Sequence, residues 1–423
     1  MGGKILRVLF VIGGSLKTNS STTICNINYI KGFIENGYKV TVLMPSCLPN
    51  EIDHSIPLPE NVEYIEFKNR GRIRKIFATI KRSNNNLQDT DNKPASSKLE
   101  DINNISFRKS IINKANIVYK KITKYVSVDP DRVWTKNASK YESDIKFDLI
   151  ISLSFPVASH LVTHNLIKKK KVNYNSWIQI WTDPWSNCLY ANKYSASKRI
   201  KMRKKEDYLL NKAEKVVYVS PLTLENQKVG FPKYRNKMSC IVLPSDNYES
   251  SNTKNDEVRC GYFGEYVSYV RNITPFYHAV KTLNINTRIV GGTDLELETT
   301  DKIKIEERVP YQKCKEYERE SDILVNISNL SGGQIPGKIY YYSATNKYIL
   351  FILDGTKEEI ETLYKFFSKF DRYVFCYNTE ESIIKGLTTI MSKYETFKGD
   401  CPIDDFIPNN IAKQIIELGK RNE

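Results

Sequence analysis

The stretch Ile5-Leu-Arg-Val-Leu-Phe-Val-Ile-Gly13-Gly14 is a short apolar run that ends in two glycines. A run of this length bounded by glycine predicts a buried β-strand over Leu6–Ile12. Helical spacing follows over Cys25–Asn36, Gly37 ends that helix, and another apolar run covers Lys39–Met44. A strand, a helix and a second strand in this order form the unit from which parallel sheets are built.

The same alternation continues through most of the chain. Further strands are predicted over Val62–Phe67, Asp148–Leu153, Trp177–Trp181, Lys215–Val219 and Ser239–Leu243, with helices over Pro156–Ile167 and Ser197–Leu210. A second series predicts strands over Val258–Phe263, Arg288–Val290, Ile303–Glu306, Ile323–Ile327, Tyr348–Leu353 and Val374–Cys376. Its helices are predicted over Ile273–Leu283, Gln312–Arg319, Pro336–Ala344, Lys357–Phe367 and Asn409–Leu418.

This pattern predicts an α/β fold of two tandem Rossmann-like, doubly wound domains that face each other across a cleft. We expect an N-terminal domain over residues 1–246 and a C-terminal domain over 257–408. Residues 409–423 would form a terminal helix that packs back on the first domain. The polar, turn-rich segment 247–256 between the domains is predicted to be a linker.

Residues 68–135 depart from this rhythm and form a basic insertion. A polar tract over 83–99 is too poor in apolar residues to pack. Apolar residues then recur at helical spacing over 111–122, among several lysines. Two interpretations stay open for that helix: it lies on a membrane surface, or it covers one edge of the sheet with a solvated basic face.

The net charge of +16 is unevenly distributed along the chain. Residues 1–250 carry +19 and residues 251–423 carry −3. A basic front half indicates a nucleic acid, an anionic membrane surface or a phosphate-bearing acceptor as partner. No nucleic-acid-binding motif is legible, so nucleic acid is the least favoured of the three.

Cysteine usage and hydropathy indicate the cellular compartment. The eight cysteines contain no C-x-x-C pair, which argues against a zinc site or a disulfide framework and for reduced thiols. No apolar run reaches the ~18 residues needed to cross a bilayer, and Arg7 interrupts the first one. We expect a cytoplasmic protein without a bound metal or cofactor, with peripheral attachment to the inner membrane as one explanation of its charge.

Polar residues follow the predicted strands of the front half, at the edge where parallel strands end. They are Gly13, Gly14 and Ser15 after the first strand, Ser154 and His160 after the strand at 148–153, and Asp183 and Trp185 after the strand at 177–181. His160 is a candidate general acid or base, and Asp183 a candidate carboxylate in a partly apolar pocket. These residues predict an acceptor-side site at one rim of the first sheet.

The back half has glycine-bearing loops at its strand ends. Gly264 and Arg271-Asn272 follow the first strand of that half, and Gly291 ends the next. Asn329-Leu-Ser-Gly-Gly333-Gln-Ile-Pro336-Gly-Lys338 then leads from a strand into a helix. Backbone amides, a guanidinium and a lysine at a helix start suit a diphosphate.

Taken together, these segments resemble the retaining GT-B-type glycosyltransferases that elongate bacterial surface polysaccharides. The most specific part of the resemblance is the loop Asn329-x4-Gln334-x-Pro336-x-Lys338, followed by Ala344-x-x-Lys347. The resemblance implies a nucleotide-sugar donor in the back half and a saccharide or lipid-linked acceptor at the front half. It implies that no metal is needed, because cations and helix ends neutralise the leaving diphosphate.

The donor site implied by the resemblance consists of Gly264, Arg271, Asn272, Gly291, Asn329, Gly333, Gln334, Pro336, Lys338, Tyr341 and Tyr342. Arg271 and Lys338 would stabilise the departing diphosphate, while Asp183 or His160 positions the acceptor hydroxyl. Three positions depart from the family pattern. Gly333 and Tyr341 stand where the family has glutamates that contact the donor, and Glu265 stands where an arginine is common. A catalytically degenerate scaffold or regulatory partner of such an enzyme is therefore the alternative function.

Overall fold

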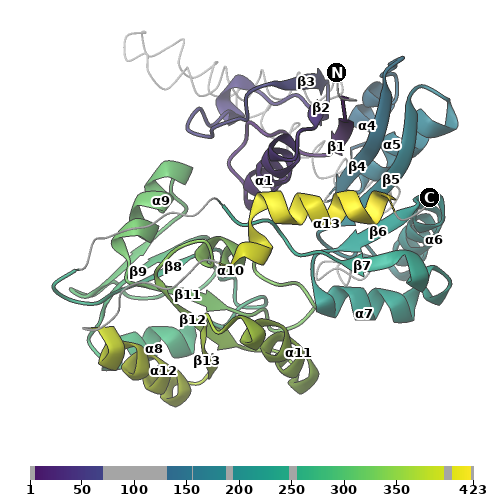
Figure 1. Ribbon diagram of the computed structural model, residues 1–423. Coiled ribbons are helices and arrows are strands. Elements are labelled where there is room, and N and C mark those ends of the chain that lie inside the picture. The colour runs from purple at the N-terminus through teal and green to yellow at the C-terminus, as the bar shows by residue number, and fades with distance from the viewer. Residues whose placement is uncertain are drawn as a thin grey trace, which may run out of the picture.

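The computed structural model describes residues 5–69, 131–154, 156–186, 194–246, 255–394 and 403–420. Most of the predicted basic insertion lies outside these residues, including its helix at 111–122. So does most of the predicted linker at 247–256. Two parallel sheets, each with helices on both faces, make up the described fold (Figure 1). The predicted arrangement of two Rossmann-like halves is thereby confirmed.

The first sheet has seven parallel strands in the order β3-β2-β1-β4-β5-β6-β7. The chain moves outward from β1 in one direction and then in the other, which is the order of a doubly wound sheet. The strands are β1 (Arg7–Ile12), β2 (Lys39–Pro45), β3 (Val62–Phe67), β4 (Lys146–Ser154), β5 (Asn173–Trp181), β6 (Lys215–Tyr218) and β7 (Met238–Cys240).

Helices cover both faces of this sheet, and its central strands are accordingly apolar on both sides. Five of the six residues of β1 are buried, whereas β3, at the sheet edge, buries none of its residues fully. One face packs against α1 (Ser21–Glu35) and α13 (Pro408–Lys420). The other packs against α4 (Arg132–Ala138), α5 (Ala158–Lys168), α6 (Ala196–Lys212) and α7 (Pro221–Gly230).

The second sheet has six parallel strands in the order β10-β9-β8-β11-β12-β13. They are β8 (Arg259–Phe263), β9 (Asn286–Val290), β10 (Ile303–Glu306), β11 (Ile323–Ile327), β12 (Tyr348–Leu353) and β13 (Val374–Tyr377). The helices of this half are α8 (Thr274–Thr282), α9 (Tyr311–Glu320), α10 (Lys338–Tyr342), α11 (Lys357–Phe367) and α12 (Glu380–Lys393). Short 3-10 turns add η1 (Pro49–Glu51), η3 (Pro232–Lys237), η4 (Ser368–Phe370) and η6 (Asp404–Phe406).

Two predicted elements are clearly shorter in the structure, and three of its described helices were not predicted. The helix expected over Pro336–Ala344 is the five-residue α10, because the glycine-bearing loop continues as far as Gly337. The strand expected over Ser239–Leu243 is the three-residue β7, which pairs with Val216–Tyr218 of the short strand β6. The unpredicted helices are α4, α7 and α12.

The last helix crosses the chain's first domain. In Figure 1, α13 is the long yellow helix that lies beside α1 and reaches toward β5. The side-chain amide of Asn36 donates a hydrogen bond to the carbonyl of Asn409 at 3.0 Å. A side-chain carbon placed on Gly32 would come within 2.1 Å of the carbonyl oxygen of Pro408. The two helices therefore touch backbone to backbone at Gly32. Within the described residues, no helix is both long enough and apolar enough to cross a bilayer.

This contact predicts that Gly32→Ala destabilises the fold even though alanine favours helix formation. The added methyl group would force α13 away from α1, and overpacking of this kind costs about 1–3 kcal/mol. Urea unfolding would measure the loss. Gly14→Ala is the matched control, because nothing lies within 4 Å of the carbon it adds. Equal stabilities for the two variants would contradict the close packing of α13.

Candidate functional site

A cavity of about 390 Å³ opens at the carboxyl ends of β8, β9 and β11. The last residues of these strands, Phe263, Val290 and Ile327, all line it. β8 and β11 are neighbours in the sheet although β9 and β10 come between them in the chain, so the strand order reverses at this point. Ligands of open α/β sheets bind in the crevice at such a switch point.

The first half of the chain supplies the opposite wall of the cavity. Asn19, Ser20, Ser21 and Ile24, at the start of α1, face the strand ends of the second half. Ser20 caps the helix by accepting a hydrogen bond from the backbone N–H of Thr23 at 3.1 Å. The positive end of the α1 dipole is therefore directed toward the cavity. The cavity lies in the cleft between the two sheets.

Two glycines shape the cavity where β8 and β9 end. A side-chain carbon on Gly291 would come within 1.9 Å of the carbonyl oxygen of Gly264. Only glycine lets the two strand ends approach this closely. The Gly264 N–H donates to the carbonyl of Val290 at 2.9 Å, which joins the two ends. At Gly264 and Gly291 the two strand ends therefore present backbone to the cavity.

A chain of paired charges, buried at Glu318 and Lys315, runs beside the cavity from one half of the protein to the other. The Lys338 ammonium forms an ion pair with Glu318, and Glu318 also pairs with Lys315 at 3.3 Å. Lys315 in turn pairs with Asp246 at 2.6 Å, and Asp246 accepts a hydrogen bond from the Asn28 amide of α1 at 2.9 Å. Two lysines of the second half are thereby fixed by carboxylates from both halves.

The protonation equilibria of this chain show how strongly its charges are coupled. Burial alone would raise the pKa of Glu318, but the Lys338 and Lys315 ammonium groups outweigh it, and the pKa is lowered. Burial alone would lower the pKa of Lys338, yet the Glu318 carboxylate raises it above its usual value. Both groups are therefore charged near neutral pH.

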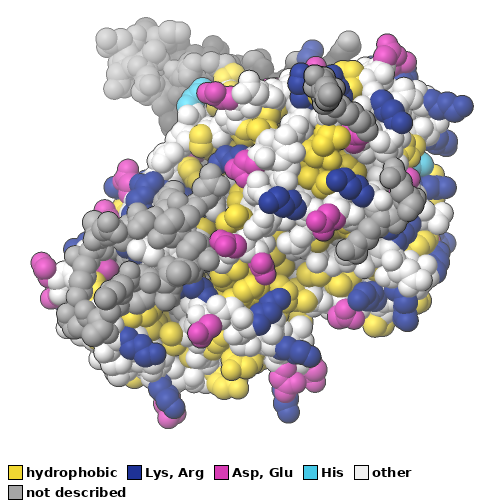
Figure 2. All heavy atoms as spheres, in the orientation of Figure 1, with side chains coloured by type: hydrophobic (Ala, Val, Ile, Leu, Met, Phe, Trp, Pro, Cys, Tyr) yellow, Lys and Arg dark blue, Asp and Glu magenta, His cyan; other side chains and the backbone are white. Residues whose placement is uncertain are grey.

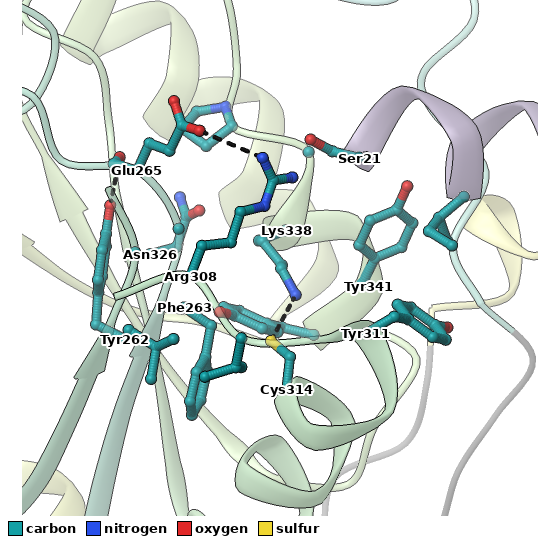
Figure 3. A pocket seen from close by; sticks show the side chains of 18 of the residues that line it. Ser21, Tyr262, Phe263, Glu265, Arg308, Tyr311, Cys314, Asn326, Lys338 and Tyr341 are labelled. Carbon is teal, nitrogen blue, oxygen red and sulfur yellow. Dashed lines mark hydrogen bonds and ion pairs between the residues drawn. The ribbon is translucent and has the colours of Figure 1, made fainter. Parts of the chain in front are cut away.

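Two arginines complete the cationic lining. The Arg271 Nε donates to the Asn329 side-chain oxygen at 2.9 Å, and its Nη1 donates to the Glu265 carbonyl at 2.7 Å. The Arg308 guanidinium lies 3.6 Å from the Glu265 carboxylate. Figure 3 shows Arg308 and Lys338 reaching into the cavity from the second half, with Ser21 coming from α1. Four cationic side chains, those of Arg271, Arg308, Lys315 and Lys338, line the cavity.

The glycine-bearing loop before α10 docks on the first half. The Gly333 carbonyl accepts hydrogen bonds from the Ser220 hydroxyl at 2.6 Å and the Thr223 hydroxyl at 3.1 Å. The Gln334 side-chain amide donates to the Asp183 carboxylate. Burial raises the pKa of Asp183, and the hydrogen bond from Gln334 opposes that rise. This loop therefore joins the rim of the first sheet to the second sheet.

Two solved structures share this architecture over nearly the full chain. A glycosyltransferase from Rickettsia africae ESF-5 superposes with a TM-score of 0.57 at 13% identity, covering 99% of both chains. Sucrose-phosphate synthase from Thermosynechococcus elongatus superposes with a TM-score of 0.55 at 12% identity, covering 99% of this chain and 94% of the other. The fold is GT-B. No known protein family's profile and no curated protein sequence matches the chain.

The GT-B cavity brings together seven of the eleven residues predicted to bind the donor: Gly264, Arg271, Gly291, Pro336, Lys338, Tyr341 and Tyr342. The other four do not line it. Gly333 and Gln334 contact the first half instead, and Asn329 supports Arg271. Asn272 bonds the N–H of Thr274 at the start of α8. The prediction that these four contact the donor is not supported by their placement.

The residues predicted on the acceptor side lie elsewhere than the cavity. Gly13 packs on Pro156, where an added carbon would come within 2.5 Å of the proline ring, and the Ser15 carbonyl accepts from the Thr18 hydroxyl at 3.0 Å. Ser154 and Trp185 are buried, and no atom lies within 4 Å of a side-chain carbon added at Gly14. Asp183 is the predicted acceptor-side residue that meets the second half, through Gln334.

His160 is not at the rim of the sheet, and the expectation that it acts as an acid or base is wrong. Its ring is fully buried, stacks on Trp181 with centroids 4.3 Å apart, and bonds the Ser152 hydroxyl through Nδ1 at 2.7 Å. Burial lowers the pKa of His160 to about 3. A neutral imidazole inside the core packs and hydrogen-bonds; it does not exchange protons with a substrate.

Sequence reasoning missed several residues of the site. Ser20 and Ser21 carried a signal, since serine before an apolar helical pattern is a helix start. Arg308, Lys315, Glu318 and Asp246 lie in segments whose sequence predicts only a turn or a charged helix face, and tertiary structure alone brings them together. Across the described residues, no three His, Cys, Asp or Glu side chains come together as a metal site would require.

The buried charge chain predicts a large effect for Glu318→Gln. The substitution leaves two lysines without their shared carboxylate, and breaking a buried pair costs about 3 kcal/mol. Because folding lowers the pKa of Glu318, its contribution is complete above its unfolded value near 4.5 and is lost as the pH falls through the lower folded value. The difference in unfolding free energy between wild type and variant should therefore shrink in acid.

Glu316→Gln is the matched control on the same helix. Its carboxylate is half exposed and pairs with Lys313 on the surface, so the substitution should leave the urea midpoint unchanged. A Glu318→Gln protein as stable as this control at pH 7 would show that the charge chain does not hold the structure.

Proposed function

We propose that the protein is a glycosyltransferase that moves a hexose-type sugar from a nucleotide-sugar donor to a saccharide or lipid-linked acceptor. The observation that carries the proposal is the cavity at the switch point of the second sheet, lined by four cationic side chains and closed by the start of α1. A pyrophosphate needs cations and helix N-termini around it. The retaining outcome and a role in capsule, O-antigen or exopolysaccharide assembly belong to the proposal through the family resemblance.

In the proposed reaction, an acceptor hydroxyl oxygen forms a bond to the anomeric carbon of the sugar. The bond from that carbon to the phosphate oxygen breaks, the hydroxyl proton is released, and the nucleoside diphosphate leaves with the negative charge. Lys338, Arg271 and Arg308 stabilise this charge where it develops. No resident metal is part of the proposal. Asp183 lies outside the cavity, at the adjoining rim of the first sheet, and contacts the glycine-bearing loop through Gln334; it is the first-half carboxylate that we propose to orient the acceptor hydroxyl.

Arg308 supports the proposal at a position where the sequence departs from the family pattern. The family commonly has an arginine where this chain has Glu265. Here Arg308 reaches the same part of the cavity from the segment between β10 and α9, and Glu265 pairs with it. We infer that Arg308 supplies the cation that residue 265 lacks, with Glu265 as its orienting partner.

A second candidate is a scaffold or regulatory partner with an inactive donor site. It is favoured by the neutralisation of two cavity cations within the protein, Lys338 by Glu318 and Arg308 by Glu265. Gly333, at one of the family's two glutamate positions, contacts the first half rather than the cavity. Calorimetry against UDP, GDP, CMP and dTDP separates the two functions: affinity for one of them supports the transferase, and no heat with any supports the scaffold.

For the transferase we expect Lys338→Ala to lower turnover of radiolabelled donor by about 10²–10³-fold, the usual effect of removing one preorganised group at such a site. Arg308→Gln should weaken binding of the nucleoside diphosphate by at least about tenfold, since it removes a charged hydrogen-bond donor. Lys313→Ala, on the exposed face of α9, is the control and should leave both values unchanged. Near-normal turnover by a folded Lys338→Ala protein would remove Lys338 from the mechanism.

A further inference from the structure

Much of the positive charge of the first half lies away from the cavity, whose four cationic side chains all come from the second half. Residues 196–237 contain 12 Lys and Arg against 4 Asp and Glu, a net +8, which is half of the charge of the whole chain in one tenth of its length. This segment forms α6, β6, α7 and η3 at one edge of the first sheet. Figure 2 shows dark blue side chains along the edge of the molecule where Figure 1 places α6 and α7.

Apolar side chains project among these cations. Val229 is 81% exposed and Ile200 is 56% exposed. Both lie next to a shallow groove of about 430 Å³ between α6 and the turn that joins α7 to η3. The groove is lined by Ile200, Arg203, Lys204, Asp207, Phe231 and Lys233. We call this surface, with the exposed Arg199, Lys201, Val229 and Arg235 around the groove, the α6–η3 face.

The α6–η3 face is held in one shape by its own contacts. The Arg203 guanidinium donates to the carbonyl of Gly230 at 2.6 Å and stacks on the Phe231 ring at 4.7 Å. Lys233 pairs with Asp207 at 2.9 Å, and the Tyr234 hydroxyl donates to the Asp207 carbonyl at 3.1 Å. These contacts tie α6 to η3, so the surrounding lysines and aliphatic side chains are displayed on a rigid support.

We propose that the α6–η3 face docks on the surface of an anionic lipid bilayer. Clustered lysines and arginines are attracted by the negative surface potential of such a membrane. Exposed aliphatic side chains among the cations can enter the boundary between headgroups and acyl chains. A single-stranded nucleic acid would instead need a row of exposed aromatic rings for stacking, and the most exposed large apolar side chains of this face are Val229 and Ile200.

The face is also coupled to the rim of the first sheet. Glu206, on the buried side of α6, accepts a hydrogen bond from the Ser186 N–H at 2.9 Å. Ser186 follows Asp183, the residue proposed to orient the acceptor. If the acceptor is lipid-linked, docking through α6 would bring this rim to the membrane. That role rests on the proposed function; the docking itself does not.

Vesicle sedimentation with the full chain tests the docking. Wild type should sediment with vesicles of phosphatidylcholine containing 30% phosphatidylglycerol, and not with phosphatidylcholine alone. Arg199→Glu, Lys201→Glu and Lys204→Glu together should lower the partition coefficient by at least about 100-fold, because each cation near the surface contributes about fivefold or more. Val229→Ser should lower it about fivefold through lost apolar burial.

The matched control reverses three exposed lysines of the second half, Lys281→Glu, Lys304→Glu and Lys365→Glu, which changes the net charge equally. It should bind anionic vesicles nearly as well as wild type. Equal sedimentation with neutral and anionic vesicles, or equal losses in the two triple variants, would overturn the proposal. Tighter binding to a 30-base-pair DNA or a 30-nucleotide RNA, lost in the α6 variant, would overturn it in favour of nucleic acid. Because no nucleotide is present, failure here leaves the donor calorimetry unaffected.

Discussion

Glu318 is a buried carboxylate that holds two ammonium groups of the second half beside the central cavity. One of them, Lys315, continues to Asp246 at the end of the first half, so a single carboxylate connects the cavity lining to the contact between the halves. Buried charges are stable only while each has its partner. A diphosphate that attracted Lys338 would compete with Glu318, and Lys315 would remain to neutralise the carboxylate. The protein can thus offer a cation to a ligand without leaving an isolated charge behind.

Among the other contacts between the two halves, three differ in character. α13 packs on α1 through backbone contact at Gly32, the loop carbonyl of Gly333 accepts from two hydroxyls at the start of α7, and Gln334 bonds Asp183. The loop over residues 329–338, which is the most specific part of the family resemblance, therefore connects the two halves in this structure. Its last residues, Pro336 and Gly337, still reach the cavity and lead into Lys338. The same short loop therefore contacts the first half and positions Lys338 at the cavity.

Polar residues of the two halves lie in different surroundings. His160, Ser152 and Trp177 form a hydrogen-bonded group inside the first sheet, where burial keeps the imidazole neutral. Arg271, Arg308, Lys315 and Lys338 lie at the carboxyl edge of the second sheet, where the cleft gives them access to an anion. The charge of the α6–η3 face is separate from both, since it lies on the outer edge of the first sheet. The basic composition of the front half therefore does not describe the cavity.

The sequence by itself determined the two parallel sheets, because apolar runs bounded by glycine and helices at 3.6-residue spacing are local patterns with local causes. It also placed Gly264 and Gly291 at strand ends and Lys338 at the start of a helix, since the topology of a doubly wound sheet fixes that edge. It could not pair Glu318 with Lys338, Arg308 with Glu265 or Asp246 with Lys315, because each pair joins different segments of the chain. Nor could it tell that His160 points into the core while Asp183 reaches the other half. Those outcomes depend on the direction in which each side chain points and on how the two sheets are placed relative to each other. Only the tertiary structure decides these, because burial and pairing are properties of the assembled fold.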